Sequence, residues 1–175
     1  SEDKKLLYIV LGSLGASVLS NKIVDFLKTI DDSYEVMFVT GAASYDEIVK
    51  NKFNSNVHIF PYVENQTRIM KRADVVITRC GASTLSEIIS LKLPSILIPS
   101  PFVPNDHQYK NAVSFMKNNA GIVLKEEDVT SELLKEEVNL LIFNDERLEL
   151  IKDNLTKMEI KDSATKIYEE IRKLI

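Results

Sequence analysis

Several residue types that build common kinds of site are scarce in this sequence. The one cysteine, Cys80, excludes an intrachain disulfide and any zinc site made from several cysteines, which fits a reducing compartment. No apolar run approaches the roughly 20 residues of a membrane-spanning helix, and residues 1–5 are too polar to begin a secretory signal. Lysine and arginine are scattered and the net charge is −4, so the basic surface of a nucleic-acid-binding protein is missing. We therefore expect a cytoplasmic protein that binds no nucleic acid.

What is present is the composition and pattern of an ordinary globular α/β domain. With 175 residues, of which 45% are hydrophobic and 27% charged, the chain can bury one sizeable core. Runs rich in valine and isoleucine alternate with segments of helical periodicity, which indicates a parallel sheet with helices on both faces. The expected strands are residues 6–11, 35–40, 57–60, 75–78, 95–99 and 121–124, and the expected helices are residues 16–30, 45–52, 65–72, 82–91, 107–118, 130–141 and 145–156. Within residues 45–52, Ile48 and Val49 are expected to face inward.

The first loop that could hold a ligand follows the first predicted strand. In an open α/β sheet, ligands bind outside the carboxyl ends of the strands. Residues 12–16 (GSLGA) lie at that position, where the free N–H groups of a helix N-terminus attract phosphate. The spacing is G-x-x-G rather than G-x-G-x-x-G, and the second strand ends in Thr40-Gly41 rather than in an acid, so NAD binding is disfavoured. From this loop alone, a ligand-free tight turn explains the glycines equally well.

A second loop of this kind, residues 79–87 (RCGASTLSE), follows the fourth predicted strand and opens a helix. Its small residues and hydroxyls offer another helix N-terminus to an anion. Thr84-x-x-Glu87 matches a capping box, in which the Glu87 carboxylate would reach back to the Thr84 backbone N–H. If the helix instead starts near Gly81, Glu87 is free to accept hydrogen bonds from two hydroxyls of a ribose. Local sequence favours the capping box.

The helix that follows the proline-rich residues 99–104 carries amide side chains. Asn105 or Asp106 can cap this helix, and Gln108 and Asn111 share one face of it at positions i and i+3. Amides suit sugar hydroxyls because they both donate and accept hydrogen bonds, although a merely solvated helix face explains the pattern equally well.

No pattern in the sequence predicts a metal site or a covalent catalyst. His107 has no acid or nucleophile beside it, so it is interpreted as a hydrogen-bonding group. His58 lies within a predicted strand and is interpreted as structural. Cys80 has no helper histidine in register and is expected to pack. The acidic clusters at residues 31–32 and 126–128 lie away from the strand ends and are expected to be solvated caps.

Three segments taken together resemble the MurG-type glycosyltransferases. They are residues 12–16, 79–88 and 94–112, and the resemblance covers essentially the whole chain. Members of that family have the GT-B architecture, in which two Rossmann-like halves enclose a cleft and the C-terminal half binds UDP-N-acetylglucosamine. The resemblance implies that residues 1–175 form a single donor-binding domain, with about six strands in a Rossmann-like parallel sheet. Where the family often has two glycines, this chain has Leu11-Gly12.

The resemblance also implies a set of substrate-binding residues. In the family, the loops at residues 12–16 and 82–84 would approach the diphosphate, and the backbone of Val63 would pair with uracil while Tyr62 shapes the slot for the base. Glu87 would hold the ribose hydroxyls, and the helix that begins at residue 107 would contact the sugar. The residues implied are Ser13, Val63, Ala82, Ser83, Thr84, Glu87, His107, Gln108 and Asn111. A sugar contact at Gln108 would leave the binding of UDP alone unchanged. No catalytic residue, metal ion or cofactor is implied in this half.

The acceptor half of the family is not encoded in this chain. That half carries a G-G-x-x-G-H loop, whereas the five glycines here are at positions 12, 15, 41, 81 and 121. The resemblance implies that the full enzyme, at the cytoplasmic face of the cell membrane, adds N-acetylglucosamine to the undecaprenyl-linked N-acetylmuramoyl-pentapeptide of peptidoglycan synthesis. This chain alone is expected to be inactive. Three alternatives stay open: the donor subunit of a split lipid-linked N-acetylglucosaminyltransferase, half of a UDP-N-acetylglucosamine 2-epimerase, and a non-catalytic interaction module.

The end of the chain predicts one further amphipathic helix, at about residues 162–173. Its apolar face is formed by Ala164, Ile167, Tyr168, Ile171 and Leu174. In GT-B enzymes the final helix commonly crosses to the other half, so in this chain we expect it to leave an apolar patch exposed or to dock elsewhere. Packing on its own sheet is the alternative.

Overall fold

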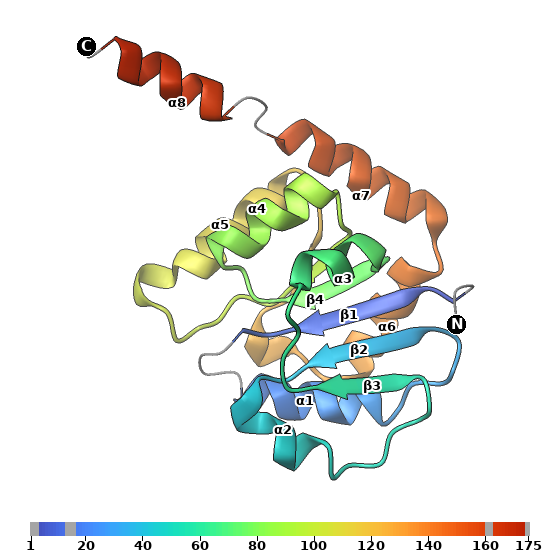
Figure 1. Ribbon diagram of the computed structural model, residues 1–175. Helices are drawn as coiled ribbons and strands as arrows, with labels where there is room; N and C mark the ends of the chain where they lie inside the picture. The colour runs from blue at the N-terminus through green and yellow to red at the C-terminus, as the bar shows by residue number, and fades with distance from the viewer. Residues whose placement is uncertain (1–3, 13–16, 160–162, 174–175) are drawn as a thin grey trace.

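The computed structural model describes residues 4–12, 17–159 and 163–173, which form a parallel sheet covered by helices on both faces (Figure 1). The strands are β1 (Leu6–Val10), β2 (Glu35–Val39), β3 (Val57–Phe60), β4 (Val75–Thr78), β5 (Ser95–Leu97) and β6 (Ile122–Val123). The helices are α1 (Ser17–Leu27), α2 (Ala42–Ile48), α3 (Gln66–Arg72), α4 (Ala82–Leu91), α5 (His107–Lys117), α6 (Ser131–Ile142), α7 (Asp145–Met158) and α8 (Ser163–Arg172), with 3-10 turns η1 (Pro104–Asp106) and η2 (Glu126–Asp128). The expected α/β fold is confirmed.

The strand order reverses direction at β1. The order in the sheet is β3-β2-β1-β4-β5-β6, and every neighbouring pair is parallel. Tyr8 at the middle of β1 pairs with Met37 on one side and with Val76 on the other. The chain therefore moves outward from β1 to β3, crosses back, and then moves outward again from β4 to β6. Figure 1 shows the consequence, with α1 and α2 on one face of the sheet and α3, α4 and α5 on the other.

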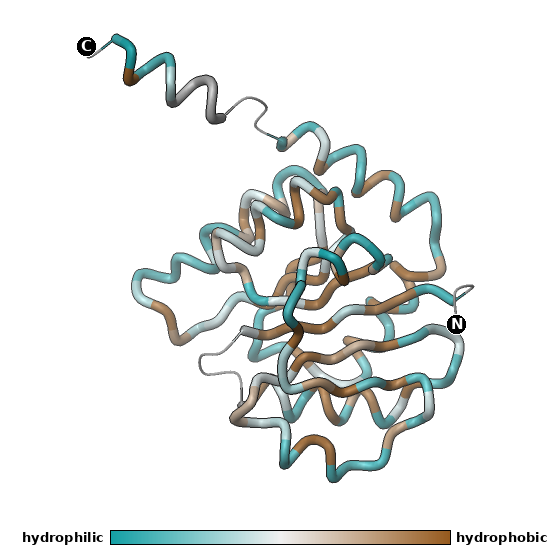
Figure 2. The backbone as a smooth tube through the Cα atoms, viewed as in Figure 1, coloured by the Kyte–Doolittle hydropathy of each residue, from teal (hydrophilic) through white to brown (hydrophobic). Residues whose placement is uncertain are grey.

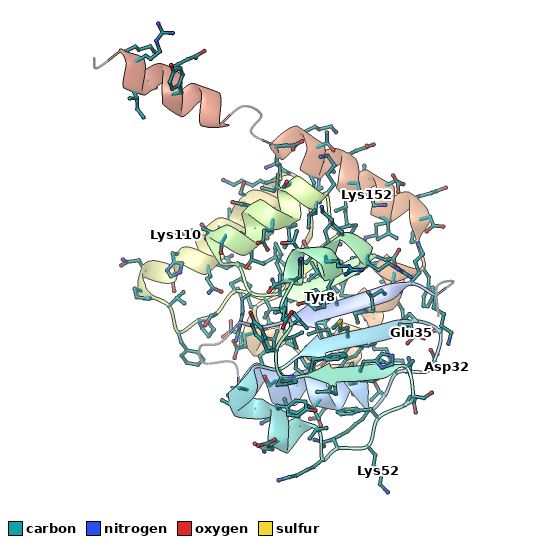
Figure 3. The ribbon with its side chains drawn as sticks, in the orientation of Figure 1. Tyr8, Asp32, Glu35, Lys52, Lys110 and Lys152 are labelled. Carbon is teal, nitrogen blue, oxygen red and sulfur yellow. The ribbon has the colours of Figure 1, made fainter. Side chains whose placement is uncertain are left out.

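The hydrophobic core lies on both faces of the central strands. Every residue of β4 and β5 is buried, whereas the edge strand β3 alternates between half-buried and exposed residues. Continuous burial is what a parallel sheet covered on both sides requires. Figure 2 shows this distribution, with hydrophobic strands in the middle of the molecule and hydrophilic stretches on the outer helices. In Figure 3, Tyr8 lies within the core, while Lys52, Lys110 and Lys152 lie at the surface.

Most predicted elements are found, and the differences fall at their ends. β1 and β2 each end one residue earlier than expected, and β5 ends two residues earlier. The second helix begins at Ala42 rather than at residue 45 because Gly41, with φ 79°, makes the turn that starts it. That helix ends at Ile48, so Val49 lies outside it and is 46% exposed. The expectation that Val49 faces inward is wrong, whereas Ile48 is buried as expected.

None of the described helices combines the length and the apolar character that crossing a bilayer needs.

Among the four glycines that the structure describes, Gly121 is the one at which an added side chain would meet the most resistance. A Cβ atom there would lie 2.9 Å from Ser95 Oγ and 3.2 Å from the Ser95 carbonyl oxygen, and Ser95 is fully buried. We expect Gly121→Ala to lower the free energy of unfolding by about 1–3 kcal/mol, because the β5–β6 pair must move apart.

Urea denaturation measures this effect, and Gly81→Ser is the matched control. Among the described residues, a Cβ atom at Gly81 would have only Thr84 Oγ1 within 4 Å, at 3.8 Å, and serine suits the N-cap position. Equal stability of the two variants would contradict the prediction.

Candidate functional site

The loops singled out in the sequence meet at the carboxyl ends of β1, β4 and β5. These strands are neighbours in the sheet and point the same way, so the segments that follow them lie side by side. Gly12 follows β1 with φ 75°, a left-handed conformation that favours glycine. Ser13 lies outside the described residues. The site therefore occupies the point of strand-order reversal, where open α/β sheets bind ligands.

The first turn of α4 presents free backbone N–H groups at this end of the sheet. Gly81 is the N-cap and forms no side-chain cap, while its carbonyl oxygen accepts from Leu85 N at 3.0 Å. The next three residues supply the unpaired N–H groups, and they are Ala82 and Ser83, both exposed, and Thr84, which is half-buried. These are the residues predicted to meet a diphosphate. A helix N-terminus of this kind attracts anions through its unpaired N–H groups and its dipole.

Glu87 is not part of a capping box. Because α4 starts at Ala82, Thr84 is already inside the helix and Glu87 is its sixth residue. The interpretation that local sequence favoured is therefore wrong, and the half-buried Glu87 carboxylate makes no hydrogen bond within the described part of the chain. Burial raises the pKa of Tyr8, and the negative charge of Glu87 adds a smaller effect in the same direction. The buried Tyr8 hydroxyl has no hydrogen-bond partner among the described residues. Sequence reasoning missed this tyrosine because its strand position signals only a core residue.

Cys80 packs in the core beneath this turn. It is fully buried, and burial raises the pKa of its thiol to about 12, against a smaller opposite effect of the Arg79 charge. A thiol with such a pKa stays protonated near neutral pH, so it is a poor nucleophile. This agrees with the expected packing role.

The amides of α5 are engaged by backbone groups. Gln108 Oε1 accepts hydrogen bonds from Cys80 N at 3.2 Å and from Ser100 N at 2.9 Å. Asn111 Nδ2 donates to the Cys80 carbonyl oxygen at 3.1 Å. The sequence predicted that both amides share a helix face, and the contacts agree. It could not show that this face lies against the loops after β4 and β5.

The start of α5 differs from the expected capping. Asn105 and Asp106 have φ of 55° and 50°, and neither side chain caps the helix. His107 is exposed, and its Nδ1 donates to the Pro104 carbonyl oxygen at 3.0 Å, while its Nε2 makes no hydrogen bond within the described part of the chain. A histidine held in this way is suited to hydrogen bonding.

The segment between β3 and α3 lies at the same end of the sheet. Val63 is half-buried, and Tyr62 beside it is 72% exposed. Asn65 ends the segment by capping α3, since its Oδ1 accepts from Arg68 N at 2.9 Å. Val63 therefore lies two residues before the N-cap of α3, with an exposed aromatic ring next to it.

A buried ion pair joins the β4 loop to the turn after β6. Arg79 Nη1 lies 2.6 Å from Glu126 Oε2, and both side chains are at least nine-tenths buried, with 8% and 6% exposed. Arg79 also donates to the Ile98 carbonyl oxygen at 3.2 Å, and Lys22 Nζ donates to the Glu126 carbonyl oxygen at 2.6 Å. The expectation that residues 126–128 are solvated caps is wrong for Glu126. No local pattern marks this residue, because its partner lies far away in the sequence.

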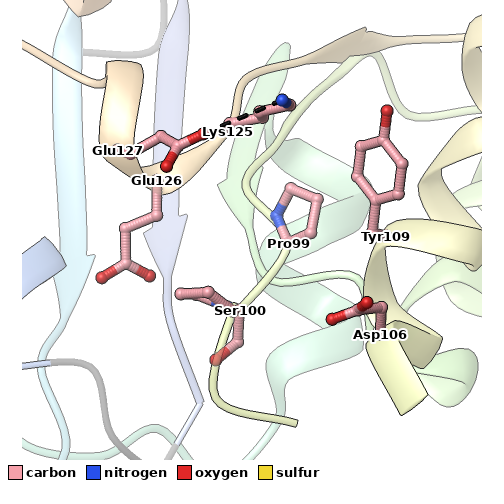
Figure 4. Close-up of a pocket in the computed structure, with 8 residues that line it drawn as sticks. Pro99, Ser100, Asp106, Tyr109, Lys125, Glu126 and Glu127 are labelled. Atoms are coloured by element: carbon pink, nitrogen blue, oxygen red, sulfur yellow. Dashed lines mark ion pairs between the residues drawn. The ribbon is translucent and has the colours of Figure 1, made fainter. Parts of the chain in front are cut away.

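A pocket of about 410 Å³ opens beside these loops (Figure 4). It lies between the loop after β5, the start of α5 and the turn η2, and Lys125 and Glu127 form an ion pair at 3.7 Å at its edge. The lining residues are Pro99, Ser100, Pro101, Asp106, Tyr109, Lys125, Glu126 and Glu127. None of the predicted ligand-binding residues that the structure describes lines it. Among the described residues, no three His, Cys, Asp or Glu side chains gather in a way that could hold a metal ion.

Comparison with known proteins decides the family. Residues 6–167 match the model described as the glycosyltransferase family 28 C-terminal domain. The chain belongs to this family. It is 38% identical over 177 residues to a UDP-N-acetylglucosamine–N-acetylmuramyl-(pentapeptide) pyrophosphoryl-undecaprenol N-acetylglucosamine transferase 1 of Bacillus cereus, covering 98% of this chain and 49% of that protein. The transferase of Bacillus cytotoxicus is 37% identical over 180 residues, covering 100% of this chain and 50% of its own length.

Solved structures show the same fold. The crystal structure of Acinetobacter baumannii MurG matches 99% of this family 28 chain and 53% of its own, with a TM-score of 0.87 and 21% sequence identity. The calicheamicin glycosyltransferase CalG4 matches 98% of the chain and 43% of its own, with a TM-score of 0.77 and 14% identity. The six-stranded sheet is thus that of one half of a GT-B glycosyltransferase. The chain spans about half the length of the curated relatives it matches.

The buried ion pair gives a testable prediction. Glu126→Gln leaves the Arg79 guanidinium buried without a counter-charge, so we expect the free energy of unfolding to fall by about 3 kcal/mol. Urea denaturation measures the change.

Glu127→Gln, one residue further on, is the control. The Glu127 side chain is 77% exposed and lies 3.7 Å from Lys125, so its loss should cost less than about 1 kcal/mol. A similar small loss for Glu126→Gln would show that the buried pair contributes nothing to stability.

Proposed function

We propose that this chain is the donor-binding half of a MurG-type N-acetylglucosaminyltransferase and binds UDP-N-acetylglucosamine. The observation that carries the proposal is 37–38% identity to such transferases over essentially the whole chain, and the α4 N-terminus without a side-chain cap agrees with it. By the same relatives' names, the acceptor is N-acetylmuramyl-(pentapeptide) pyrophosphoryl-undecaprenol. Our proposal assigns this transfer to peptidoglycan synthesis at the cytoplasmic face of the membrane.

Each part of the donor has a counterpart in the chain. The diphosphate would meet Ser13 and the first turn of α4, formed by Ala82, Ser83 and Thr84. Uracil would pair with the backbone of Val63, with Tyr62 shaping the slot. Glu87, free of a capping role, would accept the ribose hydroxyls. The amides of Gln108 and Asn111 and the Nε2 of His107 would contact the sugar.

The chemistry asked of this half is stabilisation of the leaving group. As the bond from the anomeric carbon to the diphosphate breaks, negative charge grows on the diphosphate, and the N–H groups and dipole of α4 favour that charge. A helix N-terminus does this without a metal ion. The base that deprotonates the acceptor hydroxyl, and the surface that holds the lipid-linked acceptor in line, belong in our proposal to the acceptor half.

The last helix is proposed to dock on that acceptor half. Figure 1 shows α8 standing apart from the sheet and its other helices. Two residues of its predicted apolar face are exposed, Tyr168 at 61% and Ile171 at 50%, while the side chains of Ala164, Ile167 and Leu174 lie outside those described. Exposed apolar side chains at regular helical spacing suit a partner surface.

The ribose contact is tested at Glu87. We expect Glu87→Ala to weaken UDP binding by about 1.5–3 kcal/mol, because charge-assisted hydrogen bonds to both hydroxyls are lost. Isothermal titration calorimetry measures the affinity. UDP lacking the two ribose hydroxyls should bind the wild-type protein and the variant equally.

Ser90→Ala is the control for Glu87→Ala, since Ser90 is exposed one turn further along α4. It should leave UDP affinity unchanged. If Glu87→Ala lowers thermal stability but not UDP affinity, Glu87 has a structural role and the assignment fails.

The division of labour between halves is tested with the chain alone. We expect it to bind UDP-N-acetylglucosamine, with or without a chelator of divalent ions, and to release no UDP when lipid acceptor is added. Adding the acceptor half should restore transfer. Calorimetry and an assay of released UDP are the measurements.

Three outcomes would count against this proposal. Transfer by the chain alone, near the rate of a two-domain enzyme, would mean that the base lies within these residues. Turnover of the donor without any acceptor would favour an epimerase. Absence of binding even at high ligand concentration would favour an interaction module.

A further inference from the structure

The backbone N–H and carbonyl groups of Cys80 each form a hydrogen bond with an amide side chain of α5. Gln108 Oε1 accepts from Cys80 N at 3.2 Å, and Asn111 Nδ2 donates to Cys80 O at 3.1 Å. Both amide side chains are half-buried, while Cys80 is fully buried. Both backbone polar groups of this residue thus depend on side chains from another element. We call these three residues the Cys80 clamp.

The clamp also ties two loops to each other. The same Gln108 Oε1 accepts from Ser100 N at 2.9 Å, so one oxygen bridges the segments that follow β4 and β5. Ser100 is 7% exposed, and water therefore has little access to this N–H if the bridge is lost. An unpaired buried N–H costs more than a solvated one, so the bridge holds the two loops at a fixed separation.

Cys80 comes directly before Gly81, the N-cap of α4. The direction of the free N–H groups in the first turn of α4 therefore depends on how the Cys80 peptide is held. We propose that Gln108 and Asn111 are positioning residues for the diphosphate-binding turn, in addition to their sugar contacts. This inference rests on the proposed function, since it is the donor's diphosphate that the turn would bind.

The clamp couples recognition of the sugar to binding of the diphosphate. Within the described part of the chain, Gln108 Nε2 and Asn111 Oδ1 make no hydrogen bond, so these atoms are free for sugar hydroxyls, while the other atom of each amide holds the loop. A sugar bound to the free atoms restrains the same side chains that orient the turn. The sequence alone predicted that replacing Gln108 spares UDP. The contacts predict that replacing Gln108 weakens the binding of UDP as well.

The thiol of Cys80 reports on the clamp without any ligand. It is the one cysteine of the chain, it is fully buried, and burial raises its pKa to about 12. A disulfide reagent such as dithionitrobenzoate reacts with the thiolate, so the closed loop should react slowly. In Gln108→Met, which keeps the length of the side chain without the amide, we expect the reaction to be at least about tenfold faster, because loosening exposes the thiol and lowers its pKa.

Matched variants separate the clamp from general damage. Gln108→Glu keeps the oxygen that accepts both N–H groups and should restore slow reaction. Lys110→Met changes an exposed side chain on the same helix and should react as the wild-type protein does (Figure 3). If Gln108→Met fails to fold by circular dichroism, Asn111→Asp takes its place, since it keeps the shape but cannot donate to the Cys80 carbonyl.

Calorimetry then tests the link to the ligand. We expect Gln108→Met to lower the affinity for UDP itself by about tenfold, and also to lower the affinity for UDP-N-acetylglucosamine. Unchanged UDP affinity with weaker UDP-N-acetylglucosamine binding would mean that Gln108 contacts only the sugar. If Cys80 reacts in the variant at the wild-type rate, Gln108 does not hold this loop and the proposal is wrong. If wild-type protein binds no UDP, the proposed function fails, and the ligand-free thiol rates still decide whether the clamp exists.

Discussion

The pairing of β1 with β4 is the contact on which the site depends. Strand order reverses there, so the chain leaving β1 turns to one face of the sheet and the chain leaving β4 turns to the other. In open α/β sheets this point of reversal is where ligands bind, and here the first turn of α4 brings unpaired backbone N–H groups to it. Both faces of the central strands are buried, so a slip of one residue in their pairing would move each hydrophobic side chain to the opposite face of the sheet. The register of these strands therefore fixes where the loops that follow them begin.

Polar contacts hold the segment that follows β4 against later parts of the chain. The Arg79–Glu126 pair and the Cys80 clamp both bring side chains from later elements to the segment after β4. A buried ion pair gains little over an apolar pair of similar volume, but losing one partner is costly, so such contacts favour one arrangement of the loop over others. The clamp acts in the same way through neutral hydrogen bonds, whose loss would leave buried N–H groups unpaired.

The groups at the carboxyl ends of β1, β4 and β5 suit the charged, hydroxyl-rich donor that we propose. They include helix N–H groups for an anion, a carboxylate for hydroxyls, and amides that donate and accept. The Cys80 thiol is protonated and buried. These properties suit a protein half that holds a donor and favours departure of its diphosphate, while attack by the acceptor is organised on another surface.

Local pattern was sufficient for the strands, most helices and the helix face shared by Gln108 and Asn111, because each depends on residues within a turn or a pleat of one another. It failed where local and distant partners compete. The Thr84-x-x-Glu87 spacing matched a capping box, yet packing on the sheet starts α4 at Ala82 and releases Glu87. Glu126 looked solvated until folding brought it to Arg79, and the Gln108 amide met backbone groups of two loops. Such contacts join residues distant in sequence, and only the packed chain brings them within hydrogen-bond reach.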